Sequence, residues 1–146
     1  ADLLAWESEY GKIPTHSIVL LFTGFGSYWP DAQKYLGTAL RGEAGAAALS
    51  FPGLNVDAAE WLLSQRHIKA VGIDTASIDY GASRKFSAHV MLMTHNVPAF
   101  ENVANLDKLP PKGSFVIALP MKIRGGSGGP LRIIAKVAQP PSDATH

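Results

Sequence analysis

Two side chains able to bind a divalent metal ion stand close together in the stretch HVMLMTHNVPAFENVANLD. His89 opens this stretch, and Glu101 follows twelve residues later, with Pro98 between them. A neutral imidazole and a carboxylate are ligands that Zn²⁺ or Mn²⁺ accept, and the proline can turn the chain so that the two side chains converge. A catalytic zinc site usually takes about three protein ligands, so this pair forms only part of one. Taken alone, such a pair is more often a helix-cap or surface hydrogen bond.

Two acidic residues follow an earlier apolar segment, in GIDTASID. Asp74 stands directly after the apolar run, and Asp79 lies five residues further on. An acidic side chain at a strand end can bind a metal ion, orient a histidine or accept hydrogen bonds within a turn. We predict the turn role for Asp79 and a role in orienting a metal ligand for Asp74. His95 could replace His89 as a ligand, but it is better placed to cap a helix end.

Two loops contain residues suited to substrate binding. GFGSYWP follows an apolar run, and its Phe25 and Trp29 suit an apolar or aromatic small molecule, with ordinary core packing of at least one ring as the main alternative. RGGSGGPLR is either a mobile loop that brings Ser127 near a site or a plain connection. It is not a phosphate-binding loop, because no helix start with Lys-Ser/Thr follows. A serine nucleophile is disfavoured, because Pro130 and a strand follow Ser127 where a Gly-x-Ser-x-Gly turn into a helix is required.

Alternating apolar strands and helices must position these residues. The first half predicts a helix over 2–10, a strand in HSIVLLFTG, a helix over 31–40, a connection in GEAGAAALSFPGLN, and a helix from an Asp57–Glu60 capping box to about Arg66. A strand in IKAVGIDT follows, and strand after helix after strand indicates an α/β domain with ligands outside the strand ends. The segment from His89 predicts one or two short helices broken at Pro98. SFVIALPMKI and LRIIAKV predict two further strands.

Length and composition narrow the class of protein. With 146 residues, 47% of them hydrophobic, the chain is long enough for one domain, which we expect over 1–138, with a flexible tail over 139–146. A net charge of +1 with scattered Lys and Arg argues against nucleic acid as a partner. No apolar run reaches the roughly 18 residues that cross a bilayer, so we predict a soluble chain without a membrane partner. The absence of cysteine excludes a thiolate metal site and leaves the compartment, cytoplasmic or secreted, open.

Five segments, taken in order, resemble the cyclase family of metal-dependent hydrolases, which includes bacterial kynurenine formamidase and isatin hydrolase. In the family, a TGW-type turn, a Pro-Gly-Leu helix entry and a Gly-Ile-Asp-Thr strand exit precede a histidine and a glutamate twelve residues apart, which complete a divalent metal centre. The resemblance implies that His89 and Glu101 are metal ligands here, although Phe25 stands where the family often has Trp. The segments are IPTHSIVLLFTGFGSYWPD, FPGLNVDAAEWL, AVGIDTASID, AHVMLMTHNVPAFENVANLDKLP and RGGSGGPLRIIA.

The resemblance carries expectations for fold and activity. It implies a swivelling β/β/α domain with a mixed sheet, of which this chain holds the C-terminal part. It also implies hydrolysis of an amide or lactam bond in a small aromatic substrate, with Zn²⁺ or Mn²⁺ activating a water molecule. His89 and Glu101 would hold the ion, and either could exchange protons with the water when not coordinated. Asp74 would orient a metal ligand, and Phe25 and Trp29 would line the aromatic pocket.

One family feature is missing from the sequence. The run His-x-Gly-Thr-His-x-Asp-x-Pro-x-His supplies most of the metal ligands in the family and lies upstream of the segments found here. We therefore expect either a further N-terminal portion, in a longer or a separate chain, or a naturally shortened relative. Exposed strand edges in a partial domain predict association, as a homo-oligomer or with the missing N-terminal portion. The alternative to a hydrolase is a non-catalytic protein that keeps the fold and binds a small molecule without a complete metal centre.

Overall fold

The computed structural model describes residues 1–137, which form two compact units. The first unit is Ala1–Asp107, and the second begins at Lys108. The single domain expected over 1–138 stays a prediction, and the tail expected over 139–146 lies outside the described residues. Within the described part of the chain, no helix is long and apolar enough to cross a membrane.

A three-stranded parallel sheet lies at the centre of the first unit, in the order β1-β2-β3. β1 (Ile18–Leu21) pairs along its whole length with β2 (Ala70–Ile73). All four residues of β2 are buried, as a continuous apolar run predicts for the middle strand of a parallel sheet. Both strands were predicted from the sequence. Their parallel pairing requires a crossover between them, which confirms the expected α/β class.

β3 (Ala99–Phe100) corrects one prediction. A second short helix was expected after Pro98, but the chain there is extended and pairs in parallel with β2, with Val71 opposite Ala99. The Val71 N–H donates to the Pro98 carbonyl at 3.1 Å, so pairing with a distant strand decides the local conformation. The new strand places Glu101 at its carboxyl end.

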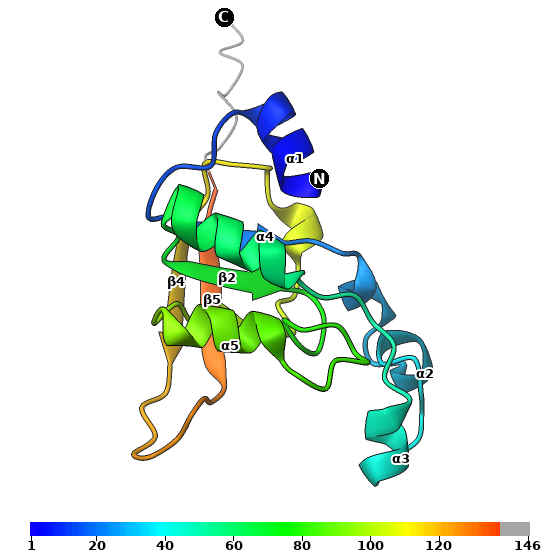
Figure 1. The fold of residues 1–146 in the computed structure, drawn as a ribbon. Helices are drawn as coiled ribbons and strands as arrows, with labels where there is room; N and C mark the ends of the chain where they lie inside the picture. The colour runs from blue at the N-terminus through cyan, green and yellow to red at the C-terminus, as the bar shows by residue number, and fades with distance from the viewer. Residues whose placement is uncertain (138–146) are drawn as a thin grey trace, which may run out of the picture. The chain divides into compact units, whose positions relative to one another are not determined.

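Figure 1 shows α4 and α5 running alongside β2 in the first unit, and Leu3 and Trp6 of a third helix, α1, pack against the core. α1 (Asp2–Tyr10) ends at Gly11, as predicted. α4 (Val56–Trp61) continues as a π-helical turn, η2 (Leu62–Arg66), and α5 (Ser87–Thr94) packs against α4. The buried core that these elements share consists of Ile13, Leu54, Ala59, Leu62, Ile68, Val71, Ile73, Ile78, Ala88, Leu92 and Val97.

Two short helices differ from the sequence prediction. α2 (Ala32–Tyr35) is shorter than the helix expected over 31–40, because the chain turns at Gly37, whose φ of 80° is unfavourable for a helix. α3 (Gly42–Ala47) lies in a segment predicted to be a connection. Its alanines have the highest helix propensity, which the prediction underweighted.

The start of α4 also differs in detail. Asn55 caps the helix by accepting a hydrogen bond from the Asp57 N–H at 2.8 Å. The predicted capping box placed Asp57 in that role, so the helix begins earlier than expected. Asn and Asp are equally good caps, and the sequence pattern alone does not choose between them.

The second unit contains an antiparallel hairpin. A 3₁₀ turn, η3 (Leu106–Lys108), marks the boundary between the units. β4 (Phe115–Pro120) and β5 (Leu131–Lys136) pair with Ile117 opposite Ile134, and both strands were predicted. In the described residues the parallel and antiparallel pairs form two separate sheets, where one mixed sheet was expected. The swivelling β/β/α label stays a prediction.

Candidate metal centre

His89 and Glu101 face each other in the first unit. His89 lies in the first turn of α5, and Glu101 directly follows β3. The imidazole Nε2 is 3.2 Å from the Glu101 Oε1, and the two side chains are 33% and 31% exposed. The structure therefore brings the two predicted ligands together at a place that solvent reaches. Their role as metal ligands stays a prediction.

Asp79 contacts the other side of the same imidazole. Its Oδ2 lies 2.6 Å from His89 Nδ1 and accepts the His89 backbone N–H at 3.1 Å, while Oδ1 accepts the Ala88 N–H at 3.0 Å. These N–H groups belong to the first turn of α5, whose N-cap residue, Phe86, provides no side-chain cap. Asp79, 3% exposed, thus caps the helix and contacts its histidine.

The charge state of Asp79 follows from these contacts. Burial alone would raise the pKa of the Asp79 carboxyl, but hydrogen bonds from the His89 ring and from the N–H groups of Ala88 and His89 outweigh it and lower the pKa. Asp79 is therefore a carboxylate near neutral pH. The sequence pattern predicted a turn role for Asp79, whereas the structure shows it in contact with a histidine.

Glu101 is held by the residue next to Asp79. The Ile78 N–H donates to Glu101 Oε1 at 2.9 Å. The backbone of this segment is anchored in turn, because the Leu54 N–H donates to the Ile78 carbonyl at 2.7 Å. Two consecutive residues, Ile78 and Asp79, therefore position the two candidate ligands.

The pair fits a cation. With a proton on Nδ1 donated to Asp79, a neutral His89 directs the lone pair of Nε2 at the Glu101 carboxylate. Two electron-pair donors that face each other call for a proton or a metal ion between them, and Zn²⁺ and Mn²⁺ accept both ligand types. Among residues 1–137, however, no group of three or more His, Asp or Glu side chains could hold a metal ion. The two candidate ligands alone are therefore fewer than the roughly three protein ligands that a catalytic zinc site takes.

Asp74 holds the turn that follows β1, and its predicted role in orienting a metal ligand stays a prediction. Its carboxylate accepts hydrogen bonds from the Thr23 N–H at 2.9 Å, the Thr23 hydroxyl at 2.6 Å and the Gly24 N–H at 2.9 Å. The Gly26 N–H adds a longer contact of 3.3 Å. Asp74, 3% exposed, therefore organises the turn that follows β1. The carboxylate that orients His89 belongs to Asp79.

The turn held by Asp74 carries the predicted aromatic residues. Phe25 begins a 3₁₀ turn, η1 (Phe25–Tyr28), and its ring meets Tyr28 edge to face at 5.3 Å. Trp29 is 69% exposed, so core packing does not account for it. Its ring meets Tyr35 edge to face at 5.5 Å. The aromatic loop thus presents a largely exposed indole, and the role of Trp29 in substrate binding stays a prediction.

Tyr35 links this loop to the neighbour of Glu101. Its hydroxyl lies 2.8 Å from the Asn102 Oδ1 and 3.1 Å from the Asp74 carbonyl oxygen. The side chain is buried, and burial together with the negative charges of Asp74 and Glu101 raises the pKa of Tyr35 to about 12. A neutral phenol therefore connects the aromatic loop to the strand end that carries Glu101.

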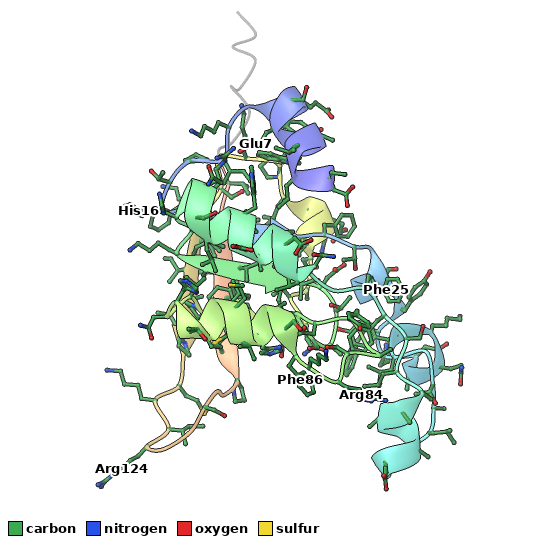
Figure 2. The ribbon with its side chains drawn as sticks, viewed as in Figure 1. Glu7, His16, Phe25, Arg84, Phe86 and Arg124 are labelled. Carbon is green, nitrogen blue, oxygen red and sulfur yellow. The ribbon has the colours of Figure 1, made fainter. Side chains whose placement is uncertain are left out.

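Phe86 is a candidate site residue that the sequence analysis missed. Its ring meets the His89 imidazole edge to face, with centroids 6.2 Å apart, and it is 54% exposed. Its φ of 48° lies in the left-handed region, which is unfavourable for a bulky residue and recurs at functional sites. Figure 2 shows Phe86 and Phe25 toward the carboxyl end of β2, where α/β proteins bind ligands. The sequence could not predict this position beside His89, because Phe86 is a lone aromatic residue in the polar stretch SRKFS and forms no pattern.

Two other predicted residues lie apart from the pair. His95 ends α5 and its Nδ1 is 2.8 Å from the Met91 carbonyl, which confirms its predicted role at a helix end. Ser127 lies between β4 and β5, in the second unit. Its predicted closeness to a substrate stays a prediction.

Comparisons with known proteins agree on a single family. The family model described as "Putative cyclase" matches residues 1–80 and so ends before His89. An isatin hydrolase from Roseibium aggregatum is 36% identical over 142 residues, which are 94% of this chain and 51% of that protein. A kynurenine formamidase from Bacillus thuringiensis subsp. konkukian is 32% identical over 101 residues, 69% of this chain and 47% of that protein.

The fold of the chain agrees with that of a solved relative. The structure of isatin hydrolase A from Ralstonia solanacearum matches with a TM-score of 0.81 and 35% identity. The match covers 91% of this chain and 50% of that one. The chain therefore spans about half the length of the relatives that it matches.

Proposed function

The chain belongs to the cyclase family, and we propose that it supplies two metal ligands, His89 and Glu101, to a hydrolase of an amide or lactam bond in a small aromatic substrate. The observation that carries this proposal is the 3.2 Å approach of the imidazole Nε2 to the Glu101 carboxylate at a solvent-accessible place. Relatives named isatin hydrolase and kynurenine formamidase support the chemistry. The same names give no support to a non-catalytic binding protein.

The chain's own residues have distinct tasks in this reaction. A bound Zn²⁺ or Mn²⁺ supplies an activated water and polarises the substrate carbonyl. His89 and Glu101 hold the ion, and the Ile78 N–H keeps the Glu101 carboxylate in place. When not coordinated, either ligand can take a proton at Nε2 or at a carboxylate oxygen. The ligands beyond these two belong to the histidine-rich portion that the family resemblance implies.

Exposed aromatic side chains select the substrate. Trp29 and Phe86 present apolar surface from two different loops, and the Phe86 ring lies against His89. A planar aromatic substrate buries such surface and stacks on it, at a gain of about 1 kcal/mol per ring contact beyond area burial. Phe25 supports the Trp29 loop through its contact with Tyr28.

Hydrolysis of isatin and of an N-formyl aromatic amine tests the proposal. The assay uses this chain together with the histidine-rich portion of the family, with Zn²⁺ or Mn²⁺, as wild type, His89→Ala and Glu101→Ala. We expect each substitution to lower metal content and to reduce turnover by more than about 100-fold. His95→Ala, at the end of the same helix, is the matched control and should retain the metal content and the turnover of the wild type. Equal metal content in wild type and both variants would contradict the proposal.

A further inference from the structure

We propose that Asp79 is a positioning residue that fixes both the ring orientation and the tautomer of His89, so that Nε2 is left as the electron-pair donor on the side of Glu101. The inference rests on the proposed function only in taking a metal ion as the partner of Nε2. The orientation and the tautomer follow from contacts within the first unit.

A single carboxylate oxygen holds both the backbone and the ring of His89. Asp79 Oδ2 accepts the His89 N–H at 3.1 Å and lies 2.6 Å from Nδ1. Because both contacts meet at one atom, the ring cannot rotate about its side-chain bonds without losing the shorter contact. Asp79 is 3% exposed, so water does not compete for that oxygen.

The carboxylate also dictates where the imidazole proton lies. A carboxylate only accepts hydrogen bonds, so the contact at Nδ1 requires a proton on that nitrogen. A neutral imidazole carries one proton, and the Asp79 contact of 2.6 Å is shorter than the 3.2 Å between Nε2 and the Glu101 carboxylate, so the proton lies on Nδ1 and Nε2 is free of it. Nε2 is the atom 3.2 Å from Glu101. The contact with Asp79 therefore selects the tautomer that a metal ion at Nε2 requires.

The backbone places Asp79 independently of His89. On one side, the Ile78 carbonyl accepts the Leu54 N–H at 2.7 Å. On the other, a Cβ on Gly53 would lie 2.2 Å from the Tyr80 backbone nitrogen, so the two segments pack without room for a side chain. The remaining oxygen, Oδ1, accepts the Ala88 N–H at 3.0 Å. The carboxylate is thus fixed by the fold, and the histidine takes its position from it.

Nitrogen NMR of the metal-free chain, labelled at histidine, tests the tautomer in the wild type. The measurement is made where the ring carries one proton, as a pH titration identifies, and His89→Gln assigns the signals. We expect a protonated Nδ1 and an unprotonated Nε2. The opposite tautomer in the wild-type protein would overturn the inference, and this arm needs no variant of Asp79 to fold.

Asp79→Ala tests the cause. The change removes the oxygen that accepts the Nδ1 proton, so we expect the ring proton to move to Nε2, beside the Glu101 carboxylate. Zn²⁺ titration of the chain together with the histidine-rich portion of the family, followed through the His89 signals, should show affinity lowered by about 10- to 100-fold. Ser83→Ala is the matched control, because it removes the 3.5 Å contact of Ser83 Oγ with Asp79 Oδ1 and the acceptor of the Phe86 N–H, but neither contact of Asp79 with His89. It should keep the wild-type tautomer.

The outcomes separate this inference from the proposed function. If Asp79→Ala folds, as its remaining amide spectrum shows, and keeps the wild-type tautomer or the wild-type Zn²⁺ affinity, the inference is wrong and the metal site stands. If the tautomers behave as expected but Zn²⁺ perturbs no His89 signal in any form, the metal role of the pair is wrong and the positioning role of Asp79 stands.

Discussion

Glu7 and Arg66 form a two-contact ion pair across 59 residues of sequence. Arg66 Nε donates to Glu7 Oε1 and Nη2 donates to Oε2, both at 2.6 Å. The guanidinium also lies over the Trp61 ring, 4.1 Å from its centroid, and the Ile13 N–H donates to the same carboxylate at 2.7 Å. Paired geometry of this kind gives Arg its advantage over Lys in binding carboxylates. The ion pair links α1, which contains Glu7, to η2, which contains Arg66.

The Glu7 ion pair predicts a pH-dependent stability. The hydrogen bonds from Arg66, opposed by burial, lower the pKa of Glu7 from 4.5 to about 2. A carboxyl whose pKa is lower in the folded state stabilises the fold above its unfolded pKa and loses that contribution as pH falls through the folded value. We expect the melting temperature of wild type to exceed that of Glu7→Gln at pH 7. The difference should shrink between about pH 4.5 and 2. Glu60→Gln, an exposed change on α4, is the control.

Removing the Asp74 carboxylate should unfold the turn that follows β1. Asp74→Asn leaves fewer acceptors for the N–H groups of Thr23 and Gly24, and each buried unsatisfied group costs about 1 to 3 kcal/mol. Thr23→Val removes the hydroxyl, which donates to Asp74 and accepts the Phe25 N–H, but keeps the N–H contacts of Asp74, and it should cost about 1 to 2 kcal/mol. Urea denaturation measures both variants. A smaller loss in Asp74→Asn than in Thr23→Val would show that the carboxylate does not organise the turn.

Replacing Phe86 by glycine should keep or raise the stability of the fold and weaken the binding of an aromatic substrate. Its left-handed φ of 48° suits glycine, so Phe86→Gly should leave stability unchanged or raise it by up to about 1 kcal/mol. The same change removes the ring beside His89, and KM for an aromatic substrate should rise severalfold with a smaller effect on kcat. Thermal unfolding and steady-state kinetics measure the two effects. Unchanged KM would remove Phe86 from the substrate-binding surface.

Alkaline titration should reveal the buried phenol of Tyr35. Because burial raises its pKa from 10.0 to about 12, the neutral phenol stabilises the fold fully below pH 10, and this contribution is lost as pH rises toward 12. We expect wild type to lose stability over this range more steeply than Tyr35→Phe does. At neutral pH, Tyr35→Phe should cost about 1 to 2 kcal/mol, because the hydroxyl contacts with Asn102 and the Asp74 carbonyl are lost. Tyr28→Phe, half exposed, should follow the wild-type curve.

Local patterns predicted much of the fold. The helix over 2–10, the strands β1 and β2, and both strands of the hairpin were found because continuous apolar runs and a glycine stop are local signals. β3 was missed because two residues after a proline contain too little pattern, and their conformation depends on pairing with β2. The candidate ligands came from the spacing of His89 and Glu101 together with the family resemblance.

The sequence by itself determined which residue types were available for a metal site, and that a histidine and a glutamate follow one strand end in order. Only the tertiary structure decided which carboxylate meets the imidazole. Asp74 and Asp79 follow the same strand five residues apart, so no local pattern distinguishes them. The chain path past Gly53 directs Asp79 at the start of α5, while Asp74 faces the turn after β1. The Asp74 contact joins residues 50 apart, and the Asp79 contact depends on packing of its segment against Gly53, so side-chain spacing along the chain does not encode them.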